Sequence, residues 1–93
     1  MQAKAMDGTD RARALEIFTA VVDLGSFSAA GRQFDLTPSA VSRTVDRIET
    51  RLGVRLLLRS TRTLTLTAEG RAYLQAARRI LADLNDAEQW NYA

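Results

Sequence analysis

The sequence predicts a mainly α-helical domain in which three helices are followed by a two-stranded β-hairpin and one long helix. Three observations lead to this expectation. Apolar residues recur every three or four positions up to residue 52 and again after residue 68, which is the helical period. Between them, over residues 55–67, the period falls to two, as in paired strands. A Thr-Pro pair and two glycines mark the expected helix boundaries.

The first helix is expected over residues 10–24, after an N-terminal arm at residues 1–9 that has no periodic pattern and is expected to be flexible. Asp10 can cap its start, and Gly25 can end it in the left-handed conformation. Its apolar face is broad. Two neighbouring stripes predict burial of Leu15, Ile17, Phe18, Val21, Val22 and Leu24.

A helix-turn-helix is expected next. Ser26 can cap a short helix over residues 27–34, and the turn at residues 35–37 leads into a helix that begins at Pro38 and stops at Gly53. A turn this short sets two helices at a steep angle. The apolar stripe of the third helix consists of Val41, Val45, Ile48 and Leu52.

The hairpin and the last helix complete the chain. Alternating residues on either side of a polar turn at 60–63 predict a wing, so residues 10–67 form a winged helix-turn-helix. Thr67 can cap a helix from Ala68 to about Trp90, within a linker and dimerisation segment at residues 68–93. Its apolar stripe extends beyond a core of this size, which predicts a homodimer interface. The interface candidates are Leu74, Ala77, Leu81 and Leu84.

Composition excludes several classes of site. The 93 residues suffice for one small core, and they include no cysteine and no histidine. Disulfides, zinc fingers and Ser-His or Cys-His catalysis are therefore excluded. We expect no catalytic residue, no metal and no cofactor, and nothing in the sequence supports an enzyme. No signal peptide is recognisable, and no apolar run approaches the ~20 residues of a membrane span, so no membrane partner is expected.

Positive charge is concentrated in one part of the sequence. Residues 43–71 contain seven arginines and three acidic residues, whereas the rest of the chain contains six basic and eight acidic residues. A local cationic face suits a polyanion such as nucleic acid. A GC-rich genome would also favour arginine over lysine, so the arginine bias alone does not decide the partner.

The residues resemble the LysR-type transcriptional regulators over roughly residues 12–90. The resemblance is carried, in order, by Leu15–Phe18, Gly25–Ala30, Thr37–Arg43, Ile48-Glu49, Leu52–Leu56, Arg59, Arg62, Leu66-Thr67 and Glu69-Gly70. It implies sequence-specific binding to double-stranded DNA at a pseudo-palindromic operator, by a homodimer whose long helices pair in antiparallel fashion. It also implies transcription regulation in the cytoplasm of a bacterium.

The third helix is the expected reader of the DNA sequence. A major groove accommodates one helix, and the N-terminal residues of that helix contact base edges. Arg43 is expected to contact a guanine and Arg47 a phosphate, while Asp46 is expected to pair with one of these two arginines. The candidate DNA-binding residues on this helix are Thr37, Pro38, Ser39, Ala40, Ser42, Arg43 and Arg47.

The hairpin tip is the second expected DNA contact. Arg59 and Arg62 flank a small polar turn, and a narrow minor groove attracts arginine. Arg11 and Arg13 in the first helix are candidates for contact with the DNA backbone, but we expect them, like Arg51, to be mostly solvated.

Four positions depart from the family pattern, namely Gly31, Phe34, Leu57 and Leu58. We expect the first three to reflect a differently packed core, whereas Leu58 is expected to place an apolar side chain at the surface. Family members carry an effector-binding domain after the long helix. The sequence ends at Ala93, so we expect any small-molecule inducer to bind outside it. Two alternatives stay open: a winged helix that kept the fold as a protein-interaction module, and a regulator with a different sensor, such as a molybdate-responsive one.

Overall fold

The computed structural model describes residues 2–89 of the chain, with side chains described from residue 11 onward. The elements in this part are α1 (Gln2–Leu24), α2 (Phe27–Phe34), α3 (Pro38–Leu52), β1 (Leu57–Arg59), β2 (Leu64–Leu66) and α4 (Ala68–Gln89). This order confirms the predicted winged helix-turn-helix with a long helix after it. None of these helices is both long and apolar enough to span a bilayer.

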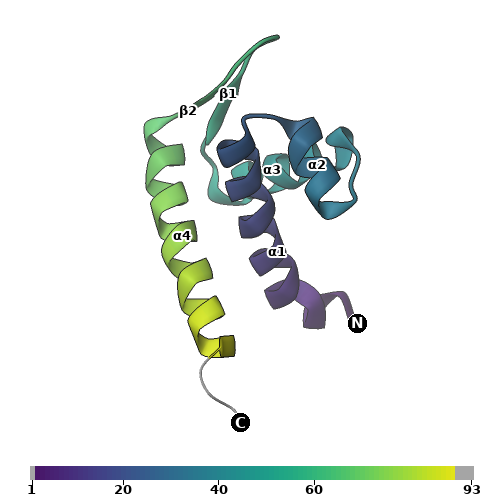
Figure 1. Cartoon of the computed structure of the whole chain (residues 1–93), viewed down its shortest axis with the longest axis vertical. Coiled ribbons are helices and arrows are strands. Elements are labelled where there is room, and N and C mark those ends of the chain that lie inside the picture. The colour runs from purple at the N-terminus through teal and green to yellow at the C-terminus, as the bar shows by residue number, and fades with distance from the viewer. Residues whose placement is uncertain (1, 90–93) are drawn as a thin grey trace.

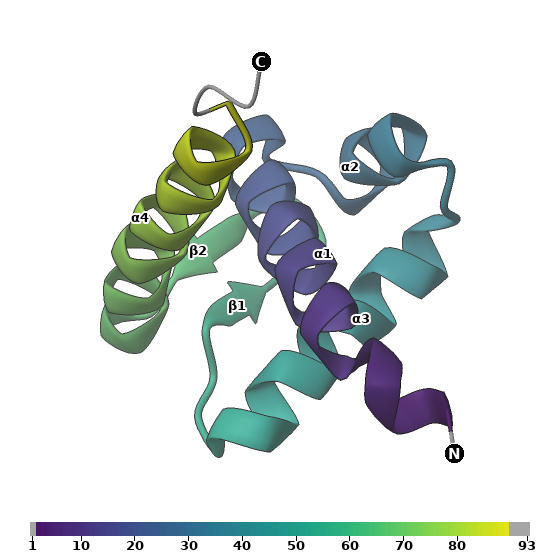
Figure 2. The ribbon, with the colours of Figure 1, turned by 90° about the horizontal axis from the view of Figure 1, so that it is seen from below.

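Helix α1 is the centre of the molecule. It packs against α2 and α3 on one side and against α4 on the other, as Figures 1 and 2 show. Its buried residues Ile17, Phe18 and Val21 meet the apolar face of α3 and the residues that enter the hairpin. The buried core also contains Ala20, Ala30, Val41, Val45, Ile48, Leu56 and Leu57.

Helix capping explains the turns of the helix-turn-helix. The Ser26 hydroxyl accepts a hydrogen bond of 3.0 Å from the Ala29 N–H at the start of α2. Asp35 ends α2 with φ of 60°, in the left-handed region that aspartate tolerates better than most residues. The Leu36 N–H then donates to the Gly31 carbonyl over 2.8 Å, and Leu36 packs against the core from the turn. The expected caps and turn are confirmed.

Four expectations about helix ends are wrong. Helix α1 begins at Gln2 and not at Asp10, so residues 2–9 are helical and Asp10 does not cap the helix. The segment Gln-Ala-Lys-Ala-Met consists of good helix formers, and this propensity outweighs the missing apolar period. Leu24 and Leu52, predicted to be buried, are 48% and 44% exposed because each lies in the last turn of its helix, beyond the edge of the core. The Trp90 end of the last helix lies outside the described residues.

The hairpin is antiparallel, with Leu57 opposite Leu66, Leu58 opposite Thr65 and Arg59 opposite Leu64. Alternation turns Leu57 into the core and leaves Leu58 55% exposed on the other face. In Figure 1 the hairpin projects beyond the helices at the end of the molecule where α4 begins. It therefore forms a wing, and we use that name for residues 57–66.

Helix α4 starts at the base of the wing. Thr67 caps it, because its hydroxyl accepts a 2.8 Å hydrogen bond from the Gly70 N–H. Gly70 packs against the strand entrance so closely that a Cβ atom there would lie 2.1 Å from the Leu56 carbonyl oxygen. Further along, the Tyr73 and Phe18 rings meet edge to face with centroids 5.2 Å apart. These contacts hold the first half of α4 against α1.

Candidate nucleic-acid interface

Helix α3 turns its apolar side to the core and its polar side outward. Val41, Val45 and Ile48 are fully or almost fully buried. The Thr37 hydroxyl accepts a 3.1 Å hydrogen bond from the Ala40 N–H, and Pro38 occupies the first turn, where its missing N–H costs nothing. The helix ends at Gly53, whose φ of 74° requires the left-handed region. The first turn is therefore well defined before any ligand binds.

The predicted reading residues fall into two groups. The exposed group lies on the outer side of α3 and consists of Thr37, Pro38, Ser39, Arg43 and Arg47. Ala40 and Ser42 are only partly exposed. Ala40 lines a groove beside α1, and the wing covers Ser42. Among the side chains described from residue 11 to 89, no acidic group forms an ion pair with Arg43 or Arg47. Their guanidinium groups are thus available to an anion.

Arg59 does not lie free beside the hairpin turn as the sequence analysis expected. Its guanidinium turns back onto α3, where Nη1 donates to the Ser42 hydroxyl over 3.1 Å and Nη2 to the Asp46 carboxylate over 2.9 Å. It also stacks over the Phe27 ring, 5.0 Å from the centroid, and its side chain is only 26% exposed. Arg59 therefore joins the wing, α3 and α2 to one another. The expectation that Asp46 pairs with Arg43 or Arg47 is wrong, because Asp46 pairs with Arg59.

Glu49 is the important residue that the sequence analysis missed. Its side chain is 6% exposed, and its carboxylate accepts hydrogen bonds from the Leu56 and Leu57 N–H groups at 2.9 and 3.2 Å. The Arg55 guanidinium contacts it at 3.1 Å and the Arg59 guanidinium at 3.7 Å. A buried carboxylate is tolerated only with such partners. The available signal was a charged residue next to the apolar stripe of α3, one position after Ile48.

The tip of the wing is held by its own backbone. The Ser60 N–H donates to the Thr63 carbonyl over 2.9 Å, and the Ser60 hydroxyl accepts from the Thr63 N–H over 3.1 Å. These bonds leave the Arg62 side chain exposed, and its guanidinium has no partner in the described part of the chain. The wing thus presents one free cation, in a turn whose shape is set by hydrogen bonds.

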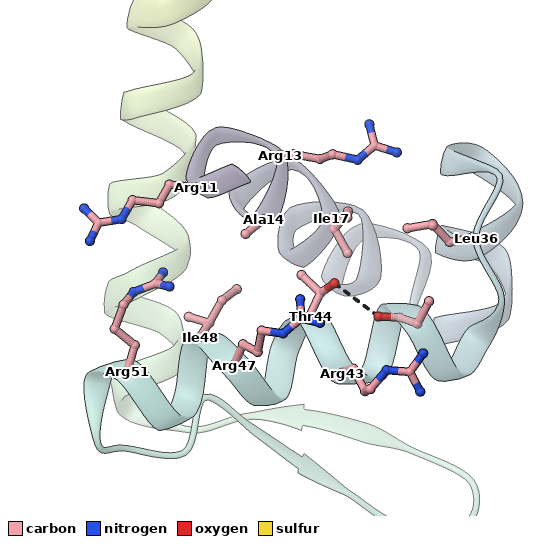
Figure 3. Close-up of a pocket in the computed structure, with 11 residues that line it drawn as sticks. Arg11, Arg13, Ala14, Ile17, Leu36, Arg43, Thr44, Arg47, Ile48 and Arg51 are labelled. Atoms are coloured by element: carbon pink, nitrogen blue, oxygen red, sulfur yellow. Dashed lines mark hydrogen bonds between the residues drawn. The ribbon is translucent and has the colours of Figure 1, made fainter. Parts of the chain in front are cut away.

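A groove of about 550 Å³ runs between α1 and α3 (Figure 3). Five arginines line it together with apolar side chains: Arg11, Arg13, Arg43, Arg47 and Arg51. Arg13 is engaged elsewhere, since it donates to the Phe34 carbonyl over 3.4 Å and lies 5.4 Å from the centre of the Phe34 ring. From the sequence, Arg11 and Arg51 are expected to be separate and mostly solvated charges. The structure brings them to one groove because α1 crosses over α3.

The apolar stripe of α4 divides into an inner and an outer part. Ala77 is completely buried against its own chain and Leu74 packs on the core, so Ala77 is wrong as a residue of a dimer interface. Leu81 is partly covered beside the end of α1. Ile80 and Leu84 are 51% and 38% exposed. The apolar surface that α1 leaves uncovered lies in the second half of α4.

Residues 12–71 match the family described as "Bacterial regulatory helix-turn-helix protein, lysR family". The chain belongs to this family. It is 43% identical over 84 residues to the HTH-type transcriptional activator AaeR of Escherichia coli, and the match covers 90% of the chain but 27% of that relative. It is 51% identical over 74 residues to the HTH-type transcriptional regulator CrgA of Neisseria meningitidis, covering 80% of the chain and 25% of CrgA. The chain thus spans about a quarter of the length of these lysR-family relatives.

Solved structures of the lysR family share the fold. The DNA-binding domain of CbnR, crystallised with DNA, superposes with a TM-score of 0.79 at 37% identity, over 84% of this chain and 90% of that one. A second CbnR structure, described as that of a LysR family transcriptional regulator, gives a TM-score of 0.77 at 37% identity over 84% of this chain and 27% of that one. The BenM domain in complex with benA site 1 DNA gives 0.79 at 31% identity, over 84% of this chain and 88% of that one.

Proposed function

We propose that this chain binds double-stranded DNA sequence-specifically, as the DNA-binding part of a LysR-type transcriptional regulator. Helix α3 enters the major groove and the wing reaches the adjacent minor groove. The observation that carries the proposal is the outer side of α3, where hydroxyls and unpaired arginines stand exposed on a rigid, capped helix. The two family domains crystallised with DNA, CbnR and BenM, support it.

Each exposed group has a distinct proposed role. Arg43 forms the bidentate contact to a guanine edge, the commonest specific contact in a major groove. Thr37 accepts the Ala40 N–H and still has its own O–H to donate to a phosphate, and Ser39 lies beside it. Pro38 is exposed and Ala40 is only partly exposed, so Pro38 is better placed to meet a thymine methyl group. Arg47 contacts a phosphate.

The wing contributes a single free arginine. Arg62 enters the minor groove, where negative potential is concentrated when the groove is narrow. Arg59 acts from behind, because its contacts with Ser42 and Asp46 set the position of the wing relative to α3. Ser42 in turn serves the protein's own structure through its hydrogen bond to Arg59.

We further propose that two copies pair through the second half of α4, with Ile80, Leu81 and Leu84 as the apolar contact. A two-fold dimer would bind a pseudo-palindromic operator, with its two α3 helices one helical turn of DNA apart or a multiple of it. Such a regulator acts where bacterial DNA is, so we place it in the cytoplasm.

Selection of bound duplexes from a random DNA pool tests the proposal. The expected result is a two-fold symmetric consensus and an affinity that falls steeply with salt. The Arg43→Ala variant should lose about 1–3 kcal/mol of discrimination at one base pair of each half-site. The matched control Arg47→Ala should weaken binding to all sequences alike. No enrichment and no salt dependence would point instead to a protein-interaction module.

A further inference from the structure

Besides Arg43 and the engaged Arg13, three more arginines line the groove between α1 and α3. Arg11, Arg47 and Arg51 line it, and none of them has an ion pair or hydrogen bond with a side chain described between residues 11 and 89. No acidic side chain described between residues 11 and 89 lines the groove either. Figure 3 shows the guanidinium groups of Arg11 and Arg51 toward the same end of the groove, one from each helix. Two like charges gathered in this way favour a shared anion.

Tyr73 of α4 lies within the field of two of these arginines. Burial raises the pKa of the Tyr73 hydroxyl, and the positive charges of Arg51 and Arg11 oppose that rise. Both guanidinium groups therefore act on the same phenol, although they come from different helices. The end of the groove where Arg11 and Arg51 lie is electropositive, with one arginine from α1 and one from α3 (Figure 3).

Three of the arginines that line the groove lie along α3, at a spacing that suits an extended anion. Arg43, Arg47 and Arg51 follow one another at intervals of four residues, so each lies about one turn from the next. All three line the groove beside α1. A single small anion would contact only one end of such a row, whereas a polymer of phosphates can contact all of it.

We propose that Arg11, Arg47 and Arg51 bind successive phosphates of the DNA strand that borders the major groove, so that the interface extends from α3 onto α1. This inference rests on the proposed function and adds a second cationic surface to the proposed DNA interface. When the outer side of α3 faces the bases, Arg11 and Arg51 lie toward the rim of the DNA major groove, where the sugar-phosphate backbone runs. They add affinity without sequence information.

The test is a salt titration of DNA binding with the double variant Arg11→Gln/Arg51→Gln of the 93-residue chain. The probes are a duplex with the selected site and a duplex of unrelated sequence. Each phosphate contact contributes about 0.9 to the slope of log affinity against log salt, so losing two should reduce the slope by about 1.8 on both duplexes. The preference for the selected site should not change.

The control Arg79→Glu removes the same net charge from an exposed position on α4 whose side chain has no ion pair in the described structure. Far-UV circular dichroism and melting temperatures confirm that all variants fold. An unchanged slope in the double variant, or a loss matched by Arg79→Glu, would overturn the proposal. So would a double variant that loses binding of inorganic phosphate but keeps its DNA slope, which would define a small-anion site. If the unmodified chain itself binds no DNA, the proposed function fails instead.

Discussion

Arg59 offers the sharpest test of how the wing is attached to the reading helix. The substitution Arg59→Met removes the guanidinium and keeps an apolar stem against Phe27. The lost interactions are the hydrogen bond to Ser42, the ion pair with the half-exposed Asp46 and the stacking on the Phe27 ring. The carboxylate of Glu49 also loses its longer contact at 3.7 Å but keeps Arg55 and two backbone N–H groups.

The size of the effect follows from these contacts. A hydrogen bond from a charged donor contributes about 1.5–3 kcal/mol, an exposed ion pair about 0.2–1 kcal/mol and the stacking about 0.5–1 kcal/mol. Against this stands the buried Nε of Arg59, which has no partner in the described structure and whose desolvation costs about 1–3 kcal/mol. We expect a net loss of about 1–2 kcal/mol, or roughly 4–16 °C in melting temperature for a domain of this size.

Thermal unfolding and DNA binding are measured together on Arg59→Met and on the matched variant Arg62→Met at the wing tip. Arg62→Met should change stability by less than about 0.5 kcal/mol, because the exposed guanidinium has no partner in the described chain, but it should weaken DNA binding. Arg59→Met should lose both stability and affinity. If Arg59→Met melts like the unmodified chain and yet loses as much affinity as Arg62→Met, Arg59 is a DNA contact and our account of it is wrong.

Two further predictions concern α4. Gly70→Ala adds a methyl group 2.1 Å from the Leu56 carbonyl oxygen and should destabilise the chain by about 2 kcal/mol in denaturant titrations, although alanine is the better helix former. The control Ala72→Gly, at an exposed position of the same helix, measures the cost of glycine in place of alanine, which should be about 1 kcal/mol. A Gly70→Ala chain more stable than the unmodified one would contradict the close packing of Gly70. The hydrogen bond from Arg78 lowers the pKa of Asp23, so this exposed pair adds stability above the unfolded carboxyl's pKa and loses it as the pH falls through the lowered folded pKa. Its contribution should be about 0.2–1 kcal/mol, and Asp23→Asn should flatten the acid limb of a stability-versus-pH curve by that amount; an unchanged limb would show that the pair contributes nothing.

The order of the elements and most of their boundaries could be predicted from the sequence, because they depend on neighbours within a few positions. Ser26, Thr37 and Thr67 cap helices through hydrogen bonds to an N–H three residues ahead. Gly53 adopts the left-handed conformation that ends a helix, and this depends on the local chain and not on how the helix packs. The start of α1 was the exception, since residues 2–9 have helix propensity but no apolar period.

The partners of charged side chains could not be predicted in this way. Asp46 has two arginines within one helical turn, yet it pairs with Arg59, 13 residues away, because the wing folds back across α3. Ala77 fits a dimer stripe by its spacing, yet it is fully buried because α4 lies against α1. Spacing shows which residues share a face and not what that face meets.

The sequence by itself determined the succession of helices and strands, the caps that bound them and the family of this chain, because all of these are written in short-range patterns. Only the tertiary structure decided that Arg59 holds the wing, that the buried Glu49 accepts the first N–H groups of the hairpin, and that Arg11 shares a groove with Arg47 and Arg51. A guanidinium at the end of a long side chain binds whichever carboxylate, ring or carbonyl the folded chain brings within reach. That choice depends on contacts between residues far apart in the sequence.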